Sequence, residues 1–114
     1  MAAVDFNIRI SPQEAVRLLD QGIVEGSFSG ERLDYYVPYH QDGRLCVVVT
    51  YEKFDYRAGN RLMLTVTIDN LGGVTHVHSI GGGGGDGAFW RFDWGASQKF
   101  TEAAWDILGA YAVR

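Results

Sequence analysis

The sequence predicts an α+β fold in which an antiparallel sheet of five or six strands carries two helices on one face. Three observations predict it. Stretches in which apolar and polar residues alternate run through the middle of the chain, and this alternation is typical of half-buried strands. Turns rich in glycine separate these stretches, so consecutive strands are expected to pair antiparallel. Two segments with helical spacing flank them, and their apolar stripes must be buried against one face of the sheet.

The chain opens with a strand and a helix. In VDFNIRI, residues 4–10, apolar and polar side chains alternate along the strand. Ser11 is expected to cap the helix that follows, and Glu14 to complete a capping box with it. Gly22 is expected to end this helix.

The remaining elements follow the same logic. Further strands are expected within residues 27–39, 45–56, 61–69, 74–80 and 88–94. The stretch 45–56 is apolar on both faces near its start, which is typical of an internal strand. The last helix presents one apolar stripe, made of Phe100, Ala103, Ala104, Ile107, Leu108 and Tyr111. The predicted order is therefore β-α-β-β-β-β-β-α, within a single domain that covers residues 1–114.

Composition narrows the classes of function. The 114 residues are 46% hydrophobic, which is enough for one core without metal or disulfides. The net charge is −4 and the ten basic residues are scattered, which argues against nucleic acid as a partner. Cys46, the single cysteine, has apolar neighbours and is expected to be a small buried side chain. The sequence predicts a cytoplasmic protein with no membrane span, no signal peptide and no cofactor.

A run of five glycines, Gly81–Gly85, raises the question of a phosphate-binding loop. Such a loop leads directly into a helix, and the Walker type also ends in Lys and Ser or Thr. Here the anionic Asp86 and a predicted strand follow the run. The run is therefore interpreted as a loop or a bent sheet edge, where missing side chains allow another backbone to approach.

Two histidines are the clearest candidate for chemistry. His76 and His78 lie two residues apart in a predicted strand, so their side chains point to the same face. Imidazoles at this spacing can ligate one metal ion, but zinc needs a third protein ligand. The sequence does not place Asp86 or His40 beside them. Structural histidines are the favoured interpretation, and a metal-dependent enzyme built on this pair is the alternative.

Aromatic residues are abundant, with three Trp, six Tyr and six Phe. Some are expected to line a pocket for a small apolar or aromatic ligand, together with the histidine pair. The expected pocket residues are Tyr35, His76, His78, Trp90 and Trp94. Phe89 falls opposite Trp90, and Trp105 lies off the apolar stripe of the last helix, so both are expected at a subunit interface.

Three stretches carry a resemblance to a known family. They are SPQEAVRLLDQGIVEGS at 11–27, YEKFDYRAGNRLMLTVTI at 51–68, and the glycine-rich segment leading to FWRFDWGASQKFTEAAWDIL at 89–108. On these stretches the chain resembles a family of small uncharacterised bacterial proteins, a domain of unknown function. That resemblance implies no activity. The strand–helix opening and the last helix also resemble, at the level of fold, the helix-grip proteins that bind lipids and hormones.

The leading hypothesis is a non-catalytic module that works as a homo-oligomer, most simply a dimer, and holds a small apolar or aromatic ligand. The metal-dependent enzyme is the first alternative. The second is a pure protein-interaction scaffold that uses an aromatic surface. The three hypotheses differ in what they require of His76, His78 and Trp105.

Overall fold

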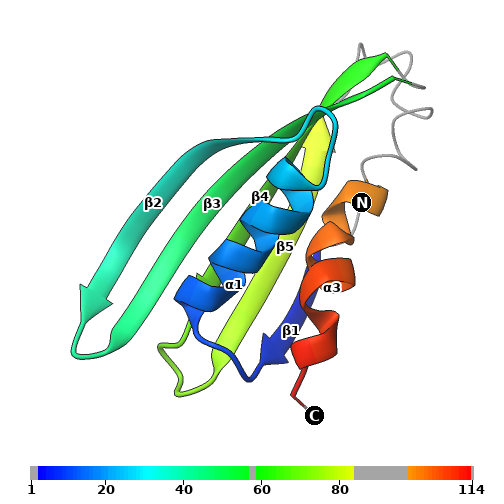
Figure 1. Cartoon of the computed structure of the whole chain (residues 1–114). Helices are drawn as coiled ribbons and strands as arrows, with labels where there is room; N and C mark the ends of the chain where they lie inside the picture. The colour runs from blue at the N-terminus through cyan, green and yellow to red at the C-terminus, as the bar shows by residue number, and fades with distance from the viewer. Residues whose placement is uncertain (1–2, 57–58, 84–97, 114) are drawn as a thin grey trace.

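The computed structural model describes residues 3–56, 59–83 and 98–113. Five antiparallel strands form one sheet in the order β1-β5-β4-β3-β2, and the helices lie on one face of it (Figure 1). The elements are β1 (Val4–Ile8), α1 (Pro12–Leu19), the π-helical η1 (Asp20–Glu25), β2 (Glu31–Gln41), β3 (Arg44–Asp55), β4 (Asn60–Asp69), β5 (Thr75–Gly83), α3 (Ala103–Leu108) and the 3-10 helix η3 (Gly109–Tyr111). The predicted α+β class is confirmed. The expected strand over residues 88–94 lies outside the described residues.

The alternation in the sequence predicts correctly which face of each inner strand is buried. In β4, the residues at even positions from Leu62 to Ile68 are at most 1% exposed, whereas their neighbours point to the other face. The core lies between the sheet and the helices. Its largest fully buried side chains are Tyr51, Phe100, Ile8, Leu19, Leu62, Leu64, Ile68 and Leu108. No helix among the described residues is long and apolar enough to cross a membrane.

The start of α1 follows the prediction only in part. Ser11 Oγ accepts a hydrogen bond from the Glu14 backbone N–H at 3.1 Å, as a cap should. The Glu14 carboxylate, however, binds Arg17 one turn along the helix, so the predicted capping box is wrong. The guanidinium offers the carboxylate a charged donor, which the Ser11 backbone N–H is not.

Gly22 does not end the first helix, contrary to the prediction. The chain continues through it as η1 to Glu25. A Cβ atom on Gly22 would lie 2.5 Å from Ile107 Cδ1 of α3. The glycine therefore provides the space in which the two helical segments pack, and this requirement is invisible in local sequence.

The first glycines of the run belong to the end of β5, where the sequence predicted a loop or a bent sheet edge. Gly81–Gly83 pair with Leu62–Leu64 of β4. The buried Gly81 N–H donates to Thr101 Oγ1 at 2.7 Å, and Ser79 Oγ donates to the Thr101 carbonyl at 2.9 Å. These bonds tie β5 to the short helical stretch, residues 98–101, that precedes α3. The rest of the run lies outside the described residues.

The two edges of the sheet differ. Along β1, residues 111–113 cover the outer side: Ile8 and Ala112 form a bridge, Arg9 N–H donates to the Tyr111 carbonyl at 2.9 Å, and Val113 N–H donates to the Asn7 carbonyl at 2.8 Å. Along β2, no described residue pairs with the outer side. In Figure 1, β2 and the adjoining part of β3 extend beyond the two helices.

Candidate functional site

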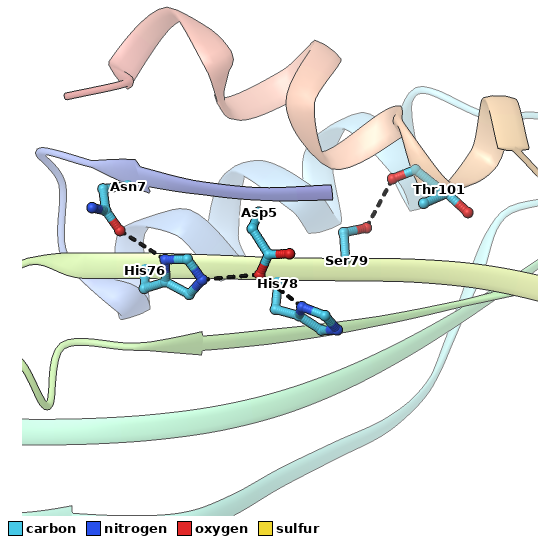
Figure 2. Close-up of polar contacts among 6 residues, drawn as sticks. All are labelled: Asp5, Asn7, His76, His78, Ser79 and Thr101. Carbon is cyan, nitrogen blue, oxygen red and sulfur yellow. Dashed lines mark hydrogen bonds and ion pairs between the residues drawn. The ribbon is translucent and has the colours of Figure 1, made fainter. Parts of the chain in front are cut away.

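The two predicted histidines lie on the open face, which is the face of the sheet opposite the helices. There they meet two side chains of β1 (Figure 2). His78 Nδ1 is 2.7 Å from Asp5 Oδ1. His76 Nε2 is 3.1 Å from the same oxygen, and His76 Nδ1 is 2.7 Å from Asn7 Oδ1. The antiparallel register of β1 and β5 produces this cluster, because it places Asp5 beside His78 and Asn7 beside His76.

In this cluster, the two imidazoles share one carboxylate oxygen on a solvent-exposed surface. Hydrogen bonds from His78, and secondarily from His76, hold the pKa of Asp5 below its usual 3.8. The three side chains are between 39% and 50% exposed, so water screens their attraction. The described residues contain no group of three His, Cys, Asp or Glu side chains placed to hold a metal ion. The described residues therefore provide no set of metal ligands for the hypothesis of a metal-dependent enzyme.

Asp5→Asn is expected to destabilise the protein by about 1 kcal/mol or less, because the contact is exposed. A lowered pKa stabilises the fold above pH 3.8, and this contribution is lost as pH falls through the folded-state value. Urea unfolding at several pH values should show the difference between wild type and variant shrinking below pH 3.8 and in high salt. Glu25→Gln, at an exposed acid outside the β2 edge, is the control. A difference that grew in acid would contradict the assignment.

Tyr35 does not join the histidines. It lies on β2, on the side of the sheet that carries the helices, where the Arg32 guanidinium is 5.1 Å from its ring centroid. Two strands and the thickness of the sheet separate it from β5. Tyr35 instead lines a hollow of about 310 Å³ between α1 and β2. The other two residues of the predicted pocket, Trp90 and Trp94, lie outside the described residues.

Trp105 projects from α3 and is 45% exposed. Its ring meets Phe6 edge-to-face, with centroids 5.0 Å apart and planes at 87°. It also lies against Gly109, where a Cβ atom would be 3.0 Å from the ring. One side of the tryptophan is thus packed within the chain. Its role at an interface stays a prediction, and Phe89 lies outside the described residues.

A polar network joins the first helical segment to two strands. Tyr51, which is fully buried, donates its hydroxyl hydrogen to Asp20 Oδ1 at 2.8 Å. Arg32 binds the second oxygen of Asp20 at 2.9 Å. Burial, and then the hydrogen bond to Asp20, raise the pKa of Tyr51 far above its usual range. The tyrosine therefore stays neutral and positions η1 on the sheet, which is a structural role.

Strand β2 is the feature that sequence analysis undervalued. All eleven of its residues are exposed. Five large apolar or aromatic side chains lie along it, each between 36% and 59% exposed: Leu33, Tyr35, Tyr36, Val37 and Tyr39. The spacing of the residues predicts a weak strand, but it cannot show that neither face of that strand is covered.

The sequence model of a family of unknown function, DUF6054, matches residues 1–112. The chain belongs to this family. The match spans both helical segments and every strand of the sheet. Comparisons with the curated proteins and with the solved structures give no match.

DUF6054 membership thus supports the family resemblance seen in the sequence and carries no activity with it. Within the described residues, two surfaces stand out. One is the β2 edge, defined as the outer side of residues 31–41. The other is a hollow at the end of β3, whose lining includes Lys53.

Proposed function

We propose that this DUF6054 protein is a non-catalytic module that forms a homodimer by pairing its β2 edge with that of a second copy. One observation carries the proposal: an eleven-residue edge strand is exposed on both faces and bears large apolar side chains. Backbone N–H and C=O groups along such an edge are best satisfied by another strand, and long exposed apolar edges promote pairing between chains.

The difference between the two edges explains why assembly would stop at two copies. At the β1 edge, residues 111–113 cover Asn7–Arg9, so β2 is the long open edge of each copy. Two identical β2 edges related by a twofold axis bury each other, and the part of β1 that is left open spans only a few residues. The product would be one continuous sheet of ten strands, five from each copy.

Tyr35 favours a second copy over an unrelated strand. A twofold axis that pairs two β2 edges antiparallel keeps the same face of each copy on the same side of the joined sheet. With the axis at Tyr35, this residue lies opposite its own symmetry mate, on the face that carries the helices. Aromatic side chains directly opposite each other across an antiparallel pair stabilise the pairing.

The open face is a weaker candidate for the same interface. Its central residues include Thr50, Thr65 and Thr67, and the Asp5 cluster lies at one side. A face with this mixture is typical of the solvated side of an antiparallel sheet. Pro38 lies within the register shift between Tyr36 and Tyr39, and such a bulge accommodates a residue that cannot donate a backbone hydrogen bond to a neighbouring strand.

Val37→Lys is expected to convert the dimer to a monomer without unfolding it, because lysine on an edge strand opposes pairing and Val37 is already exposed. Sedimentation velocity and native mass spectrometry measure the assembly, and circular dichroism checks the fold. The matched control is Ile80→Lys, an exposed residue of β5 on the open face.

Three outcomes would contradict the proposal. The wild type could be monomeric at all protein concentrations tested, which leaves β2 to a different protein or to solvent. Val37→Lys could remain dimeric. The dimer could instead be lost in Ile80→Lys or in Trp105→Ala, which would place the contact on the open face or on α3.

A further inference from the structure

Lys53 occupies an unusual position for a lysine. It lies on the side of β3 that faces the helices, two residues beyond the fully buried Tyr51, and its cross-strand neighbour Leu62 is 1% exposed. The side chain is half-buried. Its ammonium lies 4.9 Å from the centroid of the Phe100 ring.

Among the described residues, no carboxylate lies within ion-pair distance of Lys53 Nζ. A charge that is partly withdrawn from water costs free energy unless an opposite charge or hydrogen bonds compensate it. The ring face of Phe100 supplies only part of that compensation. Lys53 therefore has capacity for an anion.

Two hollows meet at Lys53. The wider one, about 360 Å³, lies beside the end of β3 and includes Lys99 and the hydroxyl-bearing Ser27 in its lining. The narrower one, about 120 Å³, also contains Lys53 and Ser27, and its walls are formed mainly by apolar residues: Ile23, Phe100, Ala103 and Ile107. The two hollows together join a polar, cationic end to an apolar slot between the helical segments.

The rim of the wider hollow carries uncovered aromatic rings. Phe28 is 94% exposed and Tyr56 is 66% exposed. The two rings contact each other at a centroid distance of 6.2 Å, and Phe54 extends the row. Neighbouring exposed rings beside a hollow are typical of a surface that an apolar group covers.

We propose that the two hollows bind a small organic monocarboxylate. Its carboxylate pairs with Lys53 and Lys99, and its apolar body lies along the narrow slot. Lys53 and Lys99 both line the wider hollow, so two cations are available to one carboxylate. Asp106 in the lining of the narrow slot disfavours a second negative charge at the apolar end of the ligand, as in a dicarboxylate.

Hexanoate is the probe for this proposal, and hexan-1-ol, which has the same apolar chain without the charge, is its control. Wild-type protein labelled with ¹⁵N should show saturable shifts of backbone amides around the two hollows when hexanoate is added. Lys53→Met, which keeps the length of the side chain, should weaken hexanoate binding about tenfold or more and leave binding of the alcohol unchanged. Lys53→Arg should retain most of the affinity.

Absence of saturable shifts in the wild type would overturn the proposal. So would equal affinity for hexanoate in wild type and Lys53→Met, or equal affinity for the acid and the alcohol. Melting temperatures of both variants verify that they fold, and if Lys53→Met does not fold, Lys53→Gln takes its place. The experiment does not depend on dimer formation, since Val37→Lys should bind hexanoate as the wild type does.

Discussion

Gly30→Ala is expected to destabilise the protein by about 3 kcal/mol, because the new methyl group has no room. A Cβ atom at this position would lie 1.9 Å from the Ile23 carbonyl oxygen and 2.9 Å from its carbonyl carbon. Both atoms belong to the backbone of η1, so no rotation of a side chain relieves the overlap. The loop between η1 and β2 would have to move, and with it the strand that begins at Glu31.

Urea unfolding of wild type, Gly30→Ala and the control Gly72→Ala measures this effect. Nothing lies within 4 Å of a Cβ atom at Gly72, so its substitution should change the free energy of unfolding by about 0.5 kcal/mol or less. Equal stability of the two variants would show that the chain does not pass Ile23 so closely. Because Gly30 directly precedes β2, the variant should also raise the dissociation constant of the proposed dimer.

Leu64→Ala is expected to cost about 3 kcal/mol, within the range found when a buried leucine is truncated. Leu64 is fully buried in β4, the middle strand of the sheet, with Tyr51 on one side and Gly81 on the other. Gly81 has no side chain that could move into the space, so most of the cavity would persist.

The neighbouring residue supplies the control. Met63 is on the open face and 43% exposed, so Met63→Ala should cost less than about 1 kcal/mol. Both free energies of unfolding are measured by urea denaturation. The slope of the free energy against urea concentration, the m value, should be the same in wild type and both variants. A larger loss at Met63 than at Leu64 would mean that β4 is shifted by one residue, since a one-residue slip exchanges the two faces of a strand.

The alternation of apolar and polar residues predicted the buried face of the strands correctly, because it follows directly from which side chains are buried. Leu62 and Leu64 face the core as their spacing indicates. The order of the strands could not be predicted in the same way, since alternation says which face is buried and not which strand lies beside which. The sequence therefore predicts β2 as one strand among several, and its place at an open edge comes only from the structure.

The candidate sites were likewise predicted only where local sequence decides the position of a side chain. A spacing of two residues correctly places His76 and His78 on one face. Their partner, Asp5, is more than 70 residues away in sequence, and only the pairing of β1 with β5 brings it close. Lys53 gives no local signal either, because a lysine near the end of a strand normally lies in solvent. Its setting arises when Phe100, 47 residues later, packs over it.

The covering of β1 by residues 111–113 has a consequence for how the protein behaves when it is damaged. A molecule that lost these residues would expose strands at both sides of its sheet. Each added copy would then present a fresh strand to the next, so growth would no longer terminate, and the product would be a filament in place of a discrete particle. On the proposed pairing, these three residues, of which Tyr111 also packs against the core, would thus separate a discrete assembly from a fibrous one.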